Sequence, residues 1–489
     1  MNSIQFGKIK DTPQFQETPP KVIQRITDEG YYYRTGDNEK GPLRIQDEED
    51  PSFYAKIAAE LSVEPKDILA AYLNELERPT TFDEVAEVLS STIRHDQPTK
   101  LILFSAMLLT FTDEDQINIL MSGESAGGKS YNALEVAAYF PSSIVLPIAT
   151  ASPTAFFHDI GRWDKEANVL RVDLRQKIII FLDQPYYLLM ERLRPLLSHD
   201  RRELLYKITD KSKRGTLQTK NVILEGFPTV VFCAAKLSLD EQERTRVFIL
   251  SPETSPKKLE ESLNLTIARV GDREGFKHQV ESNPRRRWLR SRISAIRDAN
   301  IKQVIVRDQQ EVHKRFRESH PRLIPRYQRD LPRILALIKA HAILNWHHRE
   351  SPNEATIIAD EEDVKAGFWL YSLIAKPNEL GLSPQVYEIY ERIVKPLLSD
   401  DEGVDRKTIL ARYHQLYGRP LSEAKLRQDI LPALESAGLV IQEPDPKDRR
   451  KMRVHPPHQL TIPQMLTLDG NSEPMWGTPP RGDIGSGKQ

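Results

Sequence analysis

A short glycine-rich stretch limits what this chain can fold into more than any other part of it: Gly123-Glu124-Ser125-Ala126-Gly127-Gly128-Lys129-Ser130. The apolar run 117–121 precedes it and a helix-compatible segment, 131–139, follows it, so the order is strand, turn and helix. The spacing G-x-x-x-x-G-K-S is typical of a loop whose backbone N–H groups surround phosphates at a helix N-terminus. An ordinary glycine turn is the alternative, and the flanking strand and helix favour the phosphate loop.

The residues of such a loop have distinct chemical roles. Lys129 is expected to reach the β- and γ-phosphates of a nucleotide, and Ser130 to offer its hydroxyl to Mg²⁺. Further along, the apolar run 178–182 ends in Asp183, as expected of a buried parallel strand that delivers a carboxylate to the same ion. Gln184 follows directly. The sequence therefore predicts ATP and Mg²⁺ as cofactors.

Length and composition describe a globular chain of several domains. The 489 residues are enough for about two to four of them. Hydrophobic residues make up 39% and charged residues 28%, and no apolar run has membrane-spanning length. The N-terminus has no apolar signal core, so we expect a cytoplasmic protein with no membrane partner. The single cysteine, Cys233, excludes an intramolecular disulfide and a cysteine-rich zinc site.

Positive charge is concentrated in one part of the chain. Residues 283–349 contain 17 Lys or Arg and 5 Asp or Glu, whereas the formal charge of the whole chain is −1. The block Arg285-Arg286-Arg287-Trp288-Leu289-Arg290-Ser291-Arg292 has the composition of a segment that follows a nucleic-acid backbone. A solvated helix face that pairs with acidic neighbours is the alternative.

The pattern along the first half predicts three regions. Residues 1–48 are polar and rich in Pro and Gly, and we expect a poorly ordered arm with a short docked strand at Tyr31-Tyr32-Tyr33. Helical spacing over 51–77 and 82–93 predicts a small N-terminal helical domain, 49–97. Alternating strands and helices over 98–255 predict a doubly wound or RecA-like α/β core around the phosphate loop. Within that core we expect a helix over 98–110 and strands or hairpins at 143–148, 163–174, 177–182, 204–224, 228–235 and 247–250, with helices beginning at 152 and covering 193–200.

The second half predicts three more regions. Residues 256–380 read as a basic linker and a helical lid, with an apolar face over 331–342 and a capped helix beginning at Asp360. Helices at 384–398, 405–417 and 422–437, then a strand at 439–441 and a basic turn, predict a winged helix-turn-helix over 381–455. Such modules bind DNA, and they also serve as protein contacts. Residues 456–489 are rich in Pro and Gly, and we expect a disordered tail.

A cluster of cations stands at the predicted tip of the hairpin 204–224: Lys211, Lys213 and Arg214. A basic hairpin tip is a candidate DNA contact because phosphate contacts need no sequence readout. A charged turn kept in water is the alternative.

From 98 to 455 the order of these pieces resembles the AAA+ ATPases, and within them the minichromosome-maintenance (MCM-like) helicases of cellular and mobile-element replicons. The segment PTKLILFSAMLL is similar to the family's entry helix, and RDLPRILALIKAHAILNW followed by EEDVKAGFWL is similar to its lid. This resemblance implies an AAA+ P-loop core with a helical lid. It also implies a ring, most simply a homo-hexamer, that acts on DNA with a loading or initiator protein as a further partner.

The resemblance also assigns roles to single residues. Arg329, early in the lid, would read the γ-phosphate, and the hairpin 211–214 would grip a DNA strand. Arg246, just before the last core strand, looks like the arginine finger that completes a neighbouring subunit's site, with Arg244 as the fallback.

The sequence departs from the family's pattern in three places. The family has Glu where Gln184 stands, and glutamine orients water but is a poor proton acceptor, so hydrolysis is slow or another carboxylate such as Glu124 helps. The polar sensor after the next strand is represented only by Lys236. The N-terminal OB-fold and zinc module are not present, because residues 1–97 are short and cysteine-free.

Three functions are compatible with this reading. The first is an ATP-dependent DNA helicase or translocase that acts as a ring in replication of a mobile element. The second is a nucleotide-gated DNA-binding or assembly factor with little ATP turnover, in which Gln184 makes ATP a switch. The third is a phosphotransferase that uses the same loop, although no acceptor pocket is suggested by the sequence.

Overall fold

The computed structural model describes residues 23–27, 30–35, 38–43, 58–59, 77–149, 161–183, 185, 187–199, 201–210, 218–234, 246–321, 323–398, 403–445, 448 and 450–457. Several predicted features lie outside this part of the chain: Gln184, Lys211, Lys213, Arg214, Lys236, Arg244, the helix beginning at 152, most of the helix 51–77, and nearly all of the tail.

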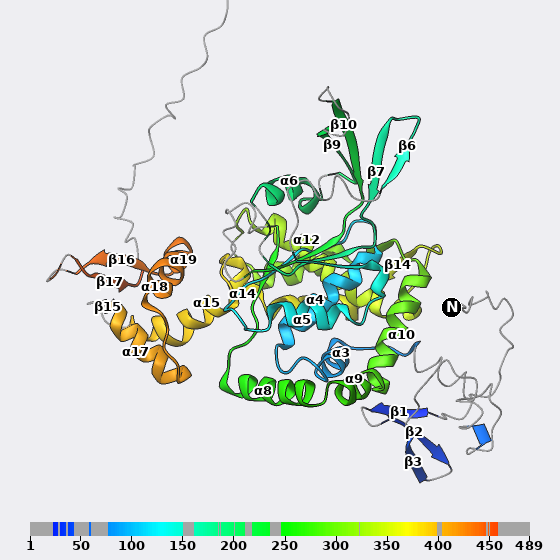
Figure 1. The fold of residues 1–489 in the computed structure, drawn as a ribbon, viewed down its shortest axis with the longest axis horizontal. Coiled ribbons are helices and arrows are strands. Elements are labelled where there is room, and N and C mark those ends of the chain that lie inside the picture. Colours follow the sequence, from blue (N-terminus) through cyan, green and yellow to red (C-terminus); the bar gives the residue numbers. More distant parts are fainter. Residues whose placement is uncertain are drawn as a thin grey trace, which may run out of the picture.

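A five-stranded parallel sheet forms the centre of the molecule (Figure 1). Its strands are short apolar runs, which is typical of parallel strands covered on both faces. The spatial order is β12, β4, β11, β8, β5, with bounds Phe248–Leu250, Ile119–Met121, Thr229–Cys233, Ile178–Phe181 and Val145–Ile148. The prediction of an α/β core is confirmed at this level.

The two faces of the sheet are covered differently. Successive strand residues point to opposite faces, and Ile119 and Ile180 belong to one apolar cluster while Leu120 and Ile179 belong to another. The first cluster is covered by helices and the second mainly by α6 and the strands β7 and β10. The helices of the first face are α3, α4, α5, α10, α12 and α13, with bounds Phe82–Leu89, Gln97–Leu108, Lys129–Ala137, Pro284–Ala299, Tyr327–Leu344 and Glu361–Ser372.

The winding of the sheet changes direction at β4. The chain passes from β4 to β5 at the far edge, returns through β8 and β11, and then crosses to β12 on the other side of β4. All five strands are parallel, so their carboxyl ends meet at one edge. In open α/β sheets ligands bind at that edge near such a switch point. The phosphate loop directly follows β4 and therefore lies there.

Two hairpins stand out from the body side by side (Figure 1). They join into a four-stranded sheet in which β7 pairs parallel with β10. Both predicted hairpins are confirmed, and α6 begins at Tyr187, earlier than the predicted 193. Their strands, with α6 between the hairpins in sequence, are β6 Arg162–Asp164, β7 Val169–Asp173, α6 Tyr187–Leu197, β9 Glu203–Asp210 and β10 Gln218–Glu225.

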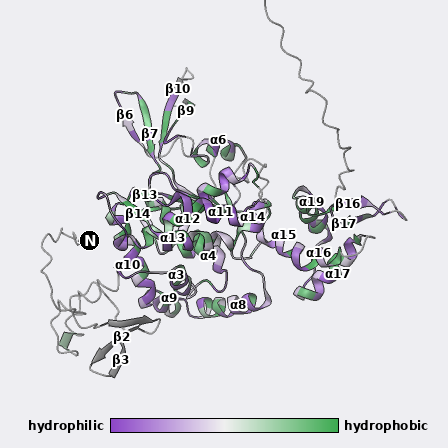
Figure 2. Cartoon of the chain, turned by 180° about the vertical axis from the view of Figure 1, so that it is seen from behind, coloured by the Kyte–Doolittle hydropathy of each residue, from purple (hydrophilic) through white to green (hydrophobic). Residues whose placement is uncertain are grey.

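The C-terminal unit, which we define as the described residues from 382 to 457, has its own apolar cluster at one end of the molecule (Figures 1 and 2). The three predicted helical segments are confirmed, whereas the strand predicted at 439–441 begins later, as β16. A three-stranded antiparallel sheet, β15-β17-β16, completes the unit. Its elements are α15 Pro384–Ile389, a π-helical turn Tyr390–Val394, α16 Lys395–Leu397, β15 Val404–Asp405, α17 Arg406–Tyr417, α18 Glu423–Lys425, a π-helical turn Leu426–Ile430, α19 Leu431–Ser436, β16 Ile441–Pro444 and β17 Met452–His455.

The N-terminal region contains strands where a poorly ordered arm was predicted. Three antiparallel strands pair in the order β1-β2-β3, with bounds Ile23–Thr27, Gly30–Thr35 and Asn38–Leu43. The expected strand at Tyr31-Tyr32-Tyr33 lies in β2, and the expectation of an arm is wrong for these three segments. Aromatic and β-branched residues such as Ile23, Ile26 and Tyr31-Tyr32-Tyr33 favour strands, and only two residues separate each strand from the next, as in β-hairpins.

The remaining elements lie between β12 and the C-terminal unit in the sequence. The predicted capped helix is confirmed: Asp360 accepts from the Asp363 N–H in a capping box at the start of α13. Asn378 donates to and accepts from the backbone of Ile249, which covers the free edge of β12. These elements are α8 Pro256–Gly271, α9 Arg273–Glu281, β13 Gln303–Val306, α11 Gln309–Ser319, β14 Thr356–Ala359 and α14 Ala375–Glu379.

The basic block of α10 is part of the interior. The Arg292 side chain is fully buried, and its guanidinium donates to the carbonyls of Leu344 and Arg78. Arg286 is also buried and lies 4.5 Å from the ring centroid of Tyr139. The interpretation of this block as a nucleic-acid track is wrong for these two side chains. Two others pair with acidic neighbours, Arg285 with Glu87 and Arg290 with Glu281.

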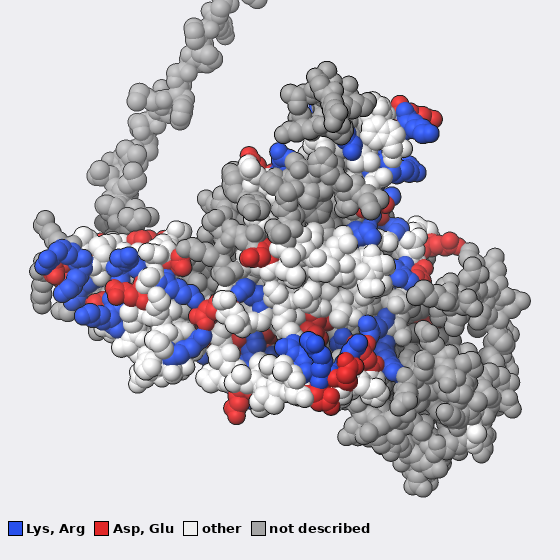
Figure 3. Space-filling view, viewed as in Figure 1, with Lys and Arg blue, Asp and Glu red and all other residues white. Residues whose placement is uncertain are grey.

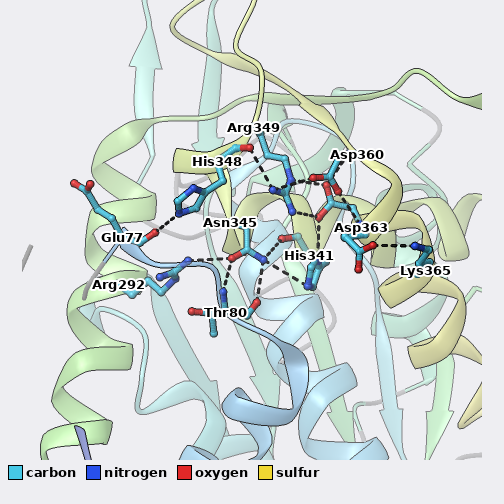
Figure 4. A network of polar contacts seen from close by, with 11 residues as sticks. Glu77, Thr80, Arg292, His341, Asn345, His348, Arg349, Asp360, Asp363 and Lys365 are labelled. Carbon is cyan, nitrogen blue, oxygen red and sulfur yellow. Dashed lines mark hydrogen bonds and ion pairs between the residues drawn. The ribbon is translucent and has the colours of Figure 1, made fainter. Parts of the chain in front are cut away.

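A buried polar network explains why Arg292 is needed (Figure 4). The Asn345 side chain accepts from the Thr80 N–H at 2.8 Å and from Arg292, and it donates to the Thr80 carbonyl at 3.0 Å. One turn earlier, His341 lies 2.6 Å from the Asp363 carboxylate, which Arg349 also contacts at 2.7 Å. The network therefore joins the segment before α3 to α10, α12 and α13.

Among the helices of the described residues, none combines the length and the apolar character that crossing a lipid bilayer requires.

Candidate functional site

The loop between β4 and α5 uses backbone conformations that its glycines permit. Gly123 has φ of 140° and Gly128 has φ of 91°, both positive. Ala126 also has a positive φ, 61°, which costs an L-residue about 1–2 kcal/mol. The Gly127 N–H donates to the Glu124 carbonyl at 3.2 Å and closes a tight turn. This backbone explains the glycine spacing of the motif.

Helix α5 begins without a side-chain cap. Its N-cap is Gly128, which cannot accept a hydrogen bond through a side chain. By contrast, Thr81, Asn283 and Asp360 cap α3, α10 and α13 with their side chains. The first N–H groups of α5 and the positive end of its dipole are therefore directed at the loop, where an anion is favoured.

Lys129 lies inside the loop that precedes it. Its ammonium donates to the carbonyls of Gly123 at 3.1 Å and Glu124 at 2.5 Å, and the residue is buried. Burial lowers the pKa of Lys129, and the charges nearby include those of Lys425 and Glu124. The predicted phosphate lysine is thus positioned where the loop closes around it.

Ser130 and Asp183 are brought together by the sheet. The Ser130 hydroxyl donates to the Leu182 carbonyl at 3.4 Å, so the end of β8 contacts the start of α5. Asp183 is the next residue and its side chain is exposed. The loop follows β4 and Asp183 follows β8, and one strand, β11, lies between these two. The predicted hydroxyl and carboxylate pair therefore occupies one edge of the sheet, with the oxygen ligands that Mg²⁺ prefers.

Cys233 is a residue of the site that the sequence reasoning missed. It ends β11 opposite Met121 of β4, and its buried thiol lies against Ser130 and near the charge of Lys129. Burial raises the pKa of this thiol to about 11. The sequence contains a signal for this position. Cys233 ends the strand next to the one that leads into the phosphate loop, and the last residue of such a strand lies near the loop.

Arg246 lies at the other edge of the sheet. Arg246 lies two residues before β12, and β12 pairs parallel with β4, so Arg246 lies toward the amino ends of these strands. The phosphate loop follows the carboxyl end of β4. One guanidinium nitrogen of Arg246, Nη1, is buried without a hydrogen-bond partner. Arg246 and the phosphate loop of its own chain therefore lie toward opposite ends of the strands.

The predicted sensor Arg329 is exposed in the first turn of α12. The buried arginine of that helix is Arg333, whose guanidinium lies 5.0 Å from the ring centroid of Phe248 and pairs with Asp330. Burial lowers the pKa of Arg333 to about 10. Arg333 contacts Phe248 of β12, while apolar residues of α12 such as Ile334 and Leu337 pack in the main core cluster.

Two cations of the C-terminal unit meet the loop, and the sequence reasoning missed both. Arg419 Nη1 lies 2.6 Å and Lys425 Nζ 2.9 Å from the two carboxylate oxygens of Glu124. These hydrogen bonds and charges outweigh burial and lower the pKa of Glu124. The cations are separated from Glu124 by about 300 residues in the chain, 295 and 301, so no local pattern could have indicated the contact.

Two comparisons of the sequence with known proteins found no match. No protein-family model matches the chain, and no curated protein is significantly similar to it.

Proposed function

We propose that the chain is a DNA-dependent ATPase of the AAA+ type that translocates on DNA as a ring. The proposal rests mainly on one contact: the Ser130 hydroxyl donates to the carbonyl of Leu182, the residue before Asp183. This contact lies at the start of α5, a helix that begins with Lys129 and has no side-chain cap. Lys129 would exchange two loop carbonyls for phosphate oxygens. Ser130 and Asp183 would hold Mg²⁺, which neutralises charge on the phosphates when bound.

The arrangement around the sheet supports the AAA+ part of the proposal. The phosphate loop follows the strand at which the winding changes direction, and the helices α12, α13 and α14 lie against β12 as the predicted lid. We propose that the C-terminal unit is a winged helix-turn-helix, and its three helical segments and three-stranded sheet support this.

The position of Arg246 supports a ring. Because Arg246 and the loop of its own chain lie toward opposite ends of the strands, it would act on the site of a neighbouring chain if it acts as an arginine finger. Such a residue stabilises charge in the transition state and is worth orders of magnitude in rate. A homo-hexamer is the ring we propose.

DNA is the proposed partner of two surfaces. The projecting sheet of β6, β7, β9 and β10 includes the two strands between which the predicted cations stand in the sequence. The turn between β16 and β17 includes Arg450 and Lys451, whose side chains are 92% and 70% exposed. Figure 3 shows Lys and Arg side chains gathered on the C-terminal unit. These cations would bind the DNA backbone without reading its sequence.

One specific observation favours the second function, a nucleotide-gated DNA-binding factor. The C-terminal unit contacts the phosphate loop through Glu124, so occupancy of the loop can alter a DNA-binding unit without turnover. Gln184 after Asp183 agrees with slow hydrolysis.

Steady-state ATP hydrolysis with and without single-stranded DNA separates the two functions. The variants are Lys129→Ala, Gln184→Glu and, as a matched control, Lys257→Ala at an exposed lysine of α8. We expect turnover that rises with DNA, disappears in Lys129→Ala and persists in Lys257→Ala. ATP binding without turnover, with hydrolysis appearing only in Gln184→Glu, would reject the translocase and support the gated factor.

A further inference from the structure

We infer that Arg419 and Lys425 are phosphate ligands that the C-terminal unit supplies to the nucleotide site of the same chain. The inference rests on the proposed nucleotide binding at the phosphate loop. It adds two positive charges from a unit otherwise proposed for DNA, and it makes the docking of that unit sensitive to nucleotide.

The segment from the end of α17 to the end of α18 presents the two cations. Helix α17 ends at Tyr417, and its C-cap, Gly418, adopts φ of 67° and directs the chain away from the helix. Arg419 follows immediately, and Lys425 ends the short helix α18. The two residues are therefore close in the chain, and both reach the carboxylate of Glu124.

The cations are close to the phosphate lysine as well as to Glu124. Lys425 is near enough to Lys129 for its charge to lower the pKa of that group. The Glu124 carbonyl accepts from Lys129 while the Glu124 carboxylate accepts from Arg419 and Lys425. One residue of the loop therefore joins all three cations.

Partial burial makes the contact more than a surface ion pair. The side chains of Glu124, Arg419 and Lys425 are 24%, 32% and 33% exposed. Nε and Nη2 of Arg419 are buried and make no hydrogen bond of good geometry, although the Tyr413 hydroxyl lies near the guanidinium. Such donors favour an additional acceptor, and phosphate oxygens pair well with the planar guanidinium.

The charge balance favours phosphate over the carboxylate alone. Glu124 carries a single negative charge and faces two cations. Nucleotide phosphates bring several negative charges to the same loop, so the two cations gain attraction when nucleotide binds. By linkage, nucleotide strengthens the docking of the C-terminal unit on the loop by the same factor by which docking strengthens nucleotide binding.

The test measures the affinity of the full chain for a fluorescent ATP analogue, in Mg²⁺ buffer. The double variant Arg419→Ala/Lys425→Ala is compared with Arg412→Ala/Arg427→Ala, two exposed arginines on neighbouring turns. We expect the first pair to weaken binding about 10- to 100-fold, and the control pair to leave it unchanged. Thermal midpoints confirm that each variant is folded.

Glu124→Gln separates a phosphate role from a merely structural clamp. If the cations bind phosphate, removing the competing and repelling carboxylate leaves nucleotide affinity equal or tighter. If the three side chains only fasten the unit to the loop, Glu124→Gln weakens binding as the double alanine variant does, and the inference is overturned. Unchanged nucleotide binding in Arg419→Ala/Lys425→Ala, including a case where only DNA binding falls, also overturns it.

Failure of the underlying function has a different signature. If the wild-type chain and Lys129→Ala bind the analogue equally weakly, the proposed nucleotide site itself is wrong. If the wild type binds, Lys129→Ala does not, and Arg419→Ala/Lys425→Ala equals its control, the nucleotide site stands and this inference alone is refuted.

Discussion

Replacing Arg292 by alanine should unfold the body of the protein at a clearly lower temperature without changing the proposed chemistry. The guanidinium is fully buried and donates to the Leu344 carbonyl at 2.9 and 2.6 Å and to the Arg78 carbonyl at 2.8 Å. It also donates to the Asn345 side chain at 3.2 Å. Alanine removes all these donors. The buried Leu344 carbonyl loses both of its Arg292 hydrogen bonds, whereas the Asn345 side chain and the Arg78 carbonyl keep those from Thr80.

The magnitude follows from those acceptors. Each buried polar group that loses its partner costs about 1–3 kcal/mol, and a hydrogen bond from a charged donor contributes about 1.5–3 kcal/mol. We expect a loss in that range and a fall in the thermal midpoint of about 5–10 °C. Arg297→Ala is the matched control, because Arg297 is on the same helix and pairs only with its exposed neighbour Asp298; we expect about 0.5 kcal/mol or less.

Thermal unfolding followed by circular dichroism measures the difference, and DNA binding at a temperature far below both midpoints is measured beside it. The reasoning assigns Arg292 to the interior and not to DNA. An Arg292→Ala variant with an unchanged midpoint and a reduced affinity for DNA would refute it, and would restore the interpretation of this block as a nucleic-acid track.

Four further outcomes can be checked. Asp183→Asn should lower Mg²⁺-dependent turnover by orders of magnitude, with a smaller effect on ATP binding, as steady-state kinetics with a Mg²⁺ titration will show. Arg246→Ala should be inactive alone. When it is mixed with wild-type chains, ATPase activity should fall by more than the fraction of variant chains, because each chain completes its neighbour's site. The Cys233 thiol has a pKa raised from 9.0 to about 11, so its alkylation should be slow at pH 8 and accelerate from pH 9 to 11; over that window the unfolded chain ionises first and stability falls, which denaturation at each pH will test. Removing the exposed Arg450 and Lys451 should weaken DNA binding across all sequences and reduce the slope of log affinity against log salt by about two.

The core was predictable because its signals are local. A run of apolar residues, a glycine spacing and a helix after it specify β4, the loop and α5 within twenty residues, and the same holds for the capping box at Asp360. The pairing of Ser130 with the end of β8 followed from a rule about parallel strands, whose carboxyl ends meet at one edge. The predicted positions of these elements therefore agree closely with the structure.

The charged residues were harder to assign because charge alone does not report burial. Arg292 and Arg450 look alike in the sequence, yet one is fully buried and the other is 92% exposed. The difference depends on which carbonyls the fold leaves without partners at the end of α12, and that is decided by tertiary packing. The contact of Arg419 with Glu124 depends on packing between distant parts of the chain in the same way.

The phosphate loop contains its own acceptors, and this affects how it would select a ligand. Lys129 already donates to two loop carbonyls, and Arg419 and Lys425 already pair with Glu124. A phosphate that enters therefore exchanges hydrogen bonds for others of similar kind, and exchange gives little net free energy. What it adds is negative charge among three cations in a partly buried site, where attraction is stronger than in water. Affinity should then rise steeply from mono- to triphosphate and fall with salt, whereas the contribution of the base should be small.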